Sequence, residues 1–226
     1  MILIDTVYQR VLALANKEQR GYITPLEFNL LANQAQLDIF EQYFYDINQF
    51  AVTDDIGIEY SSPIDTLEEK ISIFETSGVV ANGATLPSDL YKIGTVIYNG
   101  REVEQIEQKK FLYASASPLT APTDQRPIYT RNGNVITVYG SDLNIITSDV
   151  TCNYIKKPSE VNWSYDVVAG KALYNASNAI NFELHGSEET KLVLKILELA
   201  GIVINKPGLV SIASQKEANK LQQEKA

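Results

Sequence analysis

Several residue types that carry out chemistry are scarce in this 226-residue chain. It contains one cysteine, one histidine, one tryptophan and one methionine. The lone cysteine, Cys152, excludes an intrachain disulfide and a cysteine metal cluster. One histidine and one cysteine also fall short of the usual zinc ligand sets, unless ligands are shared between chains. We therefore expect neither a metal nor another cofactor.

Long apolar runs and an excess of basic residues are also lacking. No apolar stretch approaches the ~18 residues of a membrane span, and no basic start followed by an apolar run indicates a secretory signal. We therefore expect no membrane partner, and a chain made in a reducing cytoplasm. The net charge of −9 argues against tight binding to nucleic-acid phosphates, although not against a surface that DNA passes.

Sequence motifs for catalysis are missing as well. No G-x-x-x-x-G-K or G-x-G-x-x-G loop is present, and His185 has no G-x-S-x-G partner. The acidic pairs Glu68-Glu69 and Glu188-Glu189 are adjacent, so on a helix their side chains would diverge. We interpret His185 as a capping or packing residue and Cys152 as a small core residue. The sequence predicts that the protein is not an enzyme.

The first quarter of the chain has the periodicity of helices. Residues 3–16 read as an amphipathic helix. A second helix is predicted to begin at the capping box Thr24-Pro25-Leu26-Glu27 and to run to Asn48 or beyond.

Apolar residues lie on two faces of this second helix. One face holds Phe28, Leu31, Ala32, Ala35 and Ile39, and the other holds Leu30, Leu37, Phe40, Phe44 and Ile47. Two apolar faces on so long a helix indicate packing within the subunit on one side and against a neighbour on the other. A larger bundle within one chain would explain the pattern equally well. We take the second face as a candidate subunit interface.

A shorter helix near the C-terminus is apolar nearly all round. It is expected to begin at the cap Ser187 and to end at Gly201, with Pro207 preventing continuation. A surface helix needs only one apolar stripe, so we expect this one to serve both as core and as a subunit contact. Leu192 and Ile196 join the candidate interface.

The middle of the chain reads as β structure. Asn-Gly pairs at 82–83, 99–100 and 132–133 lie between β-forming runs, and Asn-Gly is the strongest short-range hairpin signal. Residues 149–156 read as one more strand. The proline-rich segment from Ser115 to Pro127 is expected to be an exposed loop, and residues 167–181 support no firm assignment.

The last dozen residues are rich in Gln, Lys and Glu and cannot bury themselves. We expect this tail to dock on a partner. Its candidate docking residues are Gln215, Lys220, Leu221 and Gln222.

These elements predict an α+β fold. Residues 1–58 and 183–226 would form a discontinuous helical bundle, and residues 59–182 would form an inserted antiparallel β-hairpin domain.

The two ends of the chain resemble virion proteins of tailed bacteriophages, of the podovirus-like and crAss-like kinds. The resembling stretches are VYQRVLALANKEQRGYITPLEFNLLANQAQLDIFEQYF, NFELHGSEETKLVLKILELAGIVI and the central LPSDLYKIGTVIYNG. Proteins of this kind look like head-to-tail connector components, adaptors or ring proteins that lie beneath the portal. The resemblance implies a dodecameric ring around the DNA channel, with C-terminal segments that reach into the portal or the next ring.

We therefore expect a structural virion protein that continues the DNA channel and joins head to tail. Its partners would be further copies of itself, the portal, neighbouring tail proteins and DNA that passes without sequence-specific binding. An acidic wall suits this role, because like charge repels the DNA backbone. The alternative is a carbohydrate- or receptor-binding virion module that uses some of the 13 tyrosines. A peptidoglycan-cleaving enzyme is a third hypothesis and needs two carboxylates facing one cleft.

Overall fold

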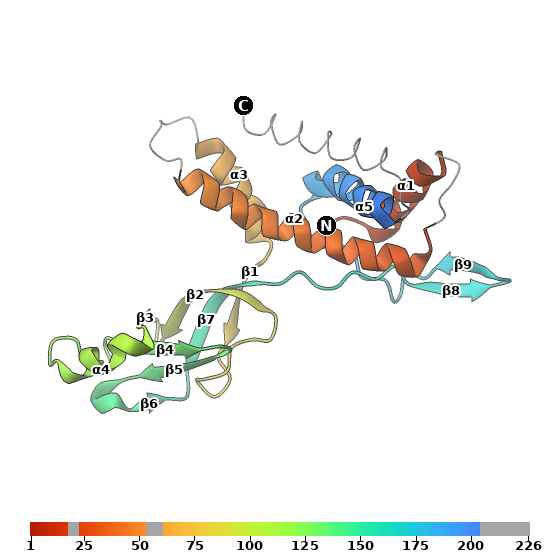
Figure 1. Ribbon diagram of the computed structural model, residues 1–226. Coiled ribbons are helices and arrows are strands. Elements are labelled where there is room, and N and C mark those ends of the chain that lie inside the picture. The colour runs from red at the N-terminus through yellow and green to blue at the C-terminus, as the bar shows by residue number, and fades with distance from the viewer. Residues whose placement is uncertain (18–22, 53–60, 204–226) are drawn as a thin grey trace. The chain divides into compact units, whose positions relative to one another are not determined.

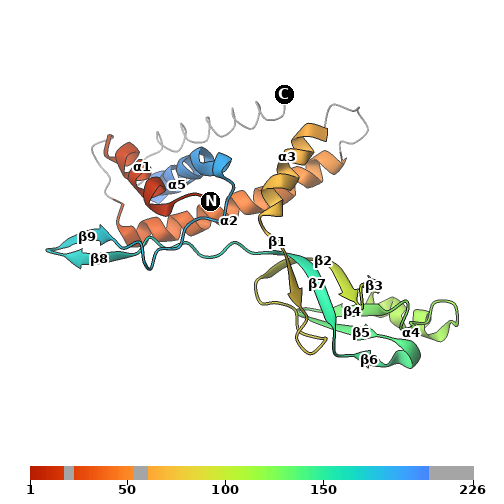
Figure 2. The ribbon, with the colours of Figure 1, turned by 180° about the vertical axis from the view of Figure 1, so that it is seen from behind.

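The computed structural model describes residues 1–17, 23–52 and 61–203, which form two compact units. A helical unit is built from Met1–Ile73 together with the chain from Pro158 onward, and a sheet unit from Phe74–Lys157. The helical unit contains α1 (Ile4–Lys17), α2 (Pro25–Val52), α3 (Ser61–Ser72), β8 (Tyr165–Val168), β9 (Lys171–Tyr174), the 3₁₀ turn η3 (Gly186–Glu188) and α5 (Glu189–Val203). Figures 1 and 2 show these elements from opposite sides.

The helical unit is organised around the long helix α2, on which α3 and α5 pack, while α1 packs on α5. The predicted capping box is confirmed. Glu27 N–H donates to Thr24 Oγ1 (3.3 Å), and Thr24 N–H donates back to Glu27 Oε2 (2.9 Å). These bonds favour the charged carboxylate and lower the pKa of Glu27. The first predicted apolar face of α2 is largely core, because Phe28, Ala32, Ala35 and Ile39 are buried and Leu31 is half-buried.

The sheet unit contains one seven-stranded sheet in the order β1-β7-β2-β3-β4-β5-β6. Its elements are β1 (Glu75–Val79), β2 (Leu90–Tyr98), β3 (Arg101–Gln105), α4 (Gln108–Ala116), β4 (Ile128–Asn132), β5 (Val135–Tyr139), the 3₁₀ turn η2 (Ser141–Leu143), β6 (Ile145–Ile146) and β7 (Val150–Lys156). The strands pair antiparallel except β3 and β4, which pair parallel through the crossover that carries α4. Buried strand residues, including Val96, Ile136, Val138 and Cys152, form the apolar core of this unit.

The prediction of a helical bundle with an inserted antiparallel hairpin domain is wrong. The described chain consists mainly of a large, curled, mixed seven-stranded sheet, accompanied by five α-helices and a separate two-stranded ribbon (Figure 1). The error has a physical cause. Asn-Gly pairs report only local turns, whereas β7 pairs with both β1 and β2 and so joins segments far apart in the sequence. The parallel β3–β4 pair has no local sequence signal either.

The three Asn-Gly pairs play different roles. Asn99 and Gly100 both have positive φ and form the two-residue turn between β2 and β3, as predicted. Asn82 and Gly83 also have positive φ, but they form a turn after β1 rather than joining two paired strands. In the β4–β5 hairpin the pairing of Asn132 with Val135 leaves Gly133 and Asn134 as the loop.

Candidate interaction surfaces

A row of side-chain amides on α2 holds an extended segment, residues 159–163. The Asn33 amide donates to Val161 O (3.0 Å) and accepts from Val161 N–H (2.8 Å). Asn29 does the same at Trp163, accepting from its N–H at 2.7 Å and donating to its carbonyl at 3.3 Å. One turn of helix separates the two asparagines, and one strand repeat of two residues separates their partners. The amides thus satisfy alternate backbone groups as a neighbouring strand would.

The opposite edge of this segment is paired too. Asn162 exchanges two backbone hydrogen bonds with Ile180, while on the α2 side Gln36 extends the amide row by donating to Ser159 O (2.8 Å) and accepting from Glu183 N–H (3.2 Å). The segment is therefore fixed along both edges, and it leads directly into β8.

Trp163 anchors the root of the β8–β9 ribbon, which we call the arm. Its indole is 3% exposed, donates from Nε1 to Asp5 Oδ1 (2.9 Å) and lies 4.4 Å from the Tyr8 ring. Tyr165 and Tyr174, opposite each other at the start of β8 and the end of β9, both stack on Trp163. One face of the arm is thereby attached to the helical unit at its root.

The remainder of the arm extends away from the helices in both views (Figures 1 and 2). Alternation along the strands places Asp166, Val168, Lys171 and Leu173 on the face opposite the two tyrosines. Val168 and Leu173 on this free face are 54% and 53% exposed. An isolated two-stranded ribbon is marginally stable in water, so an arm with exposed aliphatic side chains is a candidate for contact with another molecule.

The sequence prediction missed the arm. Its turn is Ala169-Gly170, both with positive φ, and Asn-Gly is the more familiar signal for such a turn. A hairpin here could have been predicted from the β-forming residues on either side of the turn. These are Val167 and Val168 before it and Leu173 and Tyr174 after it.

The second apolar face predicted on α2 is partly exposed and partly buried in the structure. Leu30 is 67% exposed and Leu37 is 40% exposed. Leu26, also 67% exposed, precedes them on the same side of the helix, because the spacing i, i+4, i+11 returns to nearly one angular position. We call these three residues the leucine stripe.

The other predicted interface residues are covered within their own chain. Phe40, Leu192 and Ile196 are fully buried, and Phe44 and Ile47 are half-buried, with Phe44 packed edge-on against Phe40 at 5.1 Å. A side chain enclosed by its own subunit is not available to a neighbour in this conformation. The candidate subunit contact on α2 therefore rests on Leu30 and Leu37. The predicted docking residues Gln215, Lys220, Leu221 and Gln222 lie outside the described residues.

The sheet unit carries an exposed apolar lobe of its own in the α4 crossover. Phe111 packs on Tyr139 at 4.4 Å, whereas Leu112, Tyr113 and Leu119 are 74%, 81% and 89% exposed. Part of the segment predicted as a loop from Ser115 to Pro127 is thus the end of a helix.

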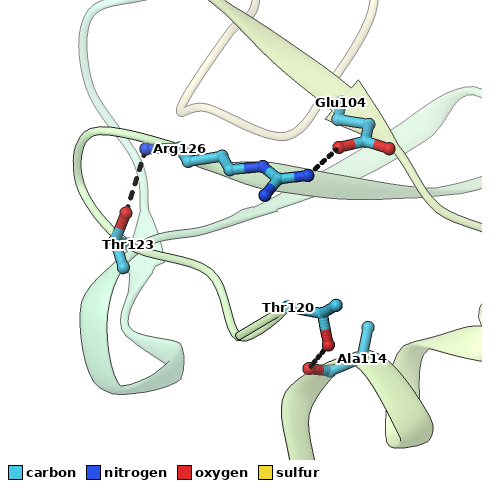
Figure 3. A network of polar contacts seen from close by, with 5 residues as sticks. All are labelled: Glu104, Ala114, Thr120, Thr123 and Arg126. Carbon is cyan, nitrogen blue, oxygen red and sulfur yellow. Dashed lines mark hydrogen bonds and ion pairs between the residues drawn. The ribbon is translucent and has the colours of Figure 1, made fainter. Parts of the chain in front are cut away.

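Polar contacts hold the chain on either side of this lobe (Figure 3). Arg126 pairs with Glu104 at 3.4 Å, its N–H donates to Thr123 Oγ1 (3.1 Å), and Thr120 Oγ1 donates to Ala114 O (3.0 Å). These contacts tie β3 and the turn after α4 to the segment that enters β4.

A shallow groove of about 490 Å³ lies over β1, β7 and β2, where β2 has register shifts between Leu90 and Val96. Its polar lining includes Ser77, Lys92 and Asn153, and Glu75 is the one carboxylate among its lining residues. Glycosidase chemistry needs two carboxylates, so this groove does not provide the arrangement that a peptidoglycan-cleaving enzyme requires.

Only two tyrosines among the described residues of the sheet unit are exposed. Tyr129 and Tyr154 are buried, Tyr98 and Tyr139 are half-buried, and the exposed Tyr91 and Tyr113 lie on β2 and α4. A contiguous aromatic patch at hairpin tips would have favoured receptor binding.

The single histidine, His185, and the single cysteine, Cys152, both have structural roles. His185 caps η3 by accepting a hydrogen bond from Ser187 N–H (3.3 Å), so the cap is His185 and not the predicted Ser187. The helix α5 also does not end at Gly201 as predicted, because it continues to Val203. Cys152 is fully buried in β7, and burial raises the pKa of its thiol.

In the parts of the chain that the structure describes, no cluster of three potential metal ligands occurs, and no helix is long and apolar enough to cross a membrane. No protein-family model matches the chain, and a comparison with curated proteins finds no significant relative.

Proposed function

We propose that this chain is a non-enzymatic virion protein that forms a ring in the connector between the portal and the tail of a bacteriophage. In that ring it would surround the DNA channel, join the head to the next tail component and contact the portal. The proposal begins from the resemblance of both chain ends to phage connector proteins.

One structural observation supports the proposal most directly. The helical unit exposes two apolar elements of different shape, the leucine stripe on α2 and the free face of the arm. A closed ring built from identical subunits needs two different contact surfaces on each subunit, because each neighbour is met through a heterologous interface. The net charge of −9 suits a channel wall along which DNA slides.

Copy number in purified virions tests this function. Quantitative mass spectrometry of the particles should give this chain and the portal protein in a ratio near one to one, or a small multiple of it. Absence from the particle would refute a structural role. A large excess over the portal would place the chain on the capsid surface or in the fibres instead of a connector ring.

A further inference from the structure

We propose that the free face of the β8–β9 arm of one subunit docks on the leucine stripe of α2 in a second copy of this chain. This inference rests on the proposed ring and names the contact that would build it. The surface on the partner copy consists of Leu26, Leu30 and Leu37, and the arm surface consists of Val168, Lys171 and Leu173.

Exposure within one chain argues for a second copy. Val168 and Leu173 are more than half exposed, and so are Leu26 and Leu30, so the arm does not cover the stripe of its own subunit. Both surfaces are aliphatic and lie in the same unit. Docking of the arm of one copy on the stripe of another would bury both apolar surfaces. It would also stabilise a ribbon that packs on its own helical unit only at its root.

The dimensions of the two surfaces agree. The stripe covers eleven residue steps of α2, which is ~16 Å at ~1.5 Å per residue. Each strand of the arm has four residues, or ~13 Å at ~3.3 Å per residue. One arm laid along one stripe would cover most of its length.

One pair of charges beside the two surfaces is complementary. Lys171 lies on the free face of the arm. Glu41 follows Leu37 by one helical turn on α2 and is exposed beside the stripe. No ion pair of either residue occurs among the described residues. An arm that lies along the stripe with its turn toward the C-terminal end of α2 brings Lys171 to Glu41, which fixes the direction of docking.

This contact is heterologous, because the arm of the second copy stays free for a third. Such contacts generate a ring when the rotation between subunits closes, and an open filament when it does not. The arm and the stripe would then be the two sides of one repeated interface.

Single-cysteine cross-linking of the purified full-length chain tests the contact. Val168→Cys and Leu37→Cys are prepared separately and mixed with a short bifunctional maleimide at rising protein concentration, because Val168 pairs with Lys171 at the end of the arm that lies nearest Leu37 and Glu41. Cys152 stays in both variants because it is fully buried, and the unmodified chain controls for its reaction. We expect a covalent dimer in the mixture, and little dimer from either variant alone or from Val168→Cys mixed with the exposed-site control Asp65→Cys.

Charge reversal then tests the direction of docking. Lys171→Glu in the arm variant should reduce the cross-link severalfold, and adding Glu41→Lys to the stripe variant should restore it, with Trp163 fluorescence confirming that the helical unit stays folded. A mixture that gives no more dimer than the control overturns the proposal. A dimer from Leu37→Cys alone would also overturn it, since two stripes would then face each other.

The two proposals can fail separately. A connector-like copy number in virions without the arm–stripe cross-link would leave the ring and reject this contact. A cross-link from a chain that is absent from virions would keep the contact and reject the connector function.

Discussion

The helical unit and the sheet unit are held together by different kinds of interaction. Of the buried polar or charged side chains in the described residues, Gln36, Asp46, Glu188 and Lys191 belong to the helical unit and only Thr130 to the sheet unit. The helical unit joins distant segments through side-chain amides and ion pairs. The sheet unit joins them through backbone ladders around an apolar core. Side-chain identity should therefore matter more for polar positions of the helical unit than for those of the sheet unit.

The chain contains one natural probe for each unit. Trp163 is the single tryptophan and is buried in the helical unit, while Cys152 is the single cysteine and is buried in the sheet unit. Tryptophan fluorescence and thiol reactivity therefore report the unfolding of the two units separately.

Removal of the buried ion pair in the helical unit should have the largest effect on stability. Lys70 Nζ lies 2.7 Å from Glu188 Oε1, with the two side chains 12% and 2% exposed. Lys70→Ala leaves the Glu188 charge without this partner in a buried site, and we expect a loss of ~3–5 kcal/mol in unfolding free energy. Urea unfolding followed by Trp163 fluorescence measures it.

The matched control is an exposed ion pair of the sheet unit. Lys110 and Glu107 are 3.5 Å apart and about 70% exposed, so Lys110→Ala should cost at most ~1 kcal/mol. Equal losses in the two variants would show that burial does not distinguish the pairs.

The next effect concerns the amide row on α2. Asn33→Asp keeps the shape of the side chain and can still accept from Val161 N–H, but it places an oxygen against Val161 O, where the amide donates. We expect a loss of ~1–3 kcal/mol by Trp163 fluorescence, because a hydrogen bond is replaced by repulsion between two acceptors.

Asn48→Asp, at an exposed position of the same helix, is the control and should be nearly neutral. If the two substitutions destabilise the helical unit equally, the amide row does not position residues 159–163.

Local signals in the sequence were sufficient for several elements of the fold. Thr24 and Glu27 defined the start of α2, and Asn99-Gly100 defined the β2–β3 turn, because each signal acts between residues close in the chain. Sequence patterns did not reveal that β7 lies between β1 and β2 or that β3 pairs parallel with β4. Those pairings depend on packing between remote segments, which one sequence does not display.

The candidate surfaces were predicted only in part. Leu30 and Leu37 are exposed, but helical periodicity could not separate them from Phe40, which is equally apolar and is buried. Exposure depends on which neighbouring helix covers each side of α2. The role of Asn29 and Asn33 was also hidden, because their partners lie more than 120 positions away.

The smallest effect concerns pH and has opposite signs in the two units. Burial raises the pKa of Cys152 and of Tyr129 in the sheet unit, whereas hydrogen bonds from Thr24 lower the pKa of Glu27 in the helical unit. A raised pKa means that folding favours the protonated group. The sheet unit should therefore keep its full stability below the ordinary thiol pKa of ~8.5 and lose stability as the pH rises above it. The helical unit should instead lose the contribution of Glu27 as the pH falls below the ordinary Glu value of ~4.3.

Urea unfolding at about pH 8 and pH 10 tests the alkaline side, since these values lie on either side of the ordinary thiol pKa. We expect the circular-dichroism transition to move to lower urea at the higher pH by more than the Trp163 transition does. Cys152→Ala should reduce this difference, because the thiol that must stay protonated is gone. Tyr129 and Tyr154, whose pKa values are also raised by burial, should account for what remains. An alkaline loss that is equal for both signals and unchanged in Cys152→Ala would show that the buried thiol does not couple folding of the sheet unit to pH.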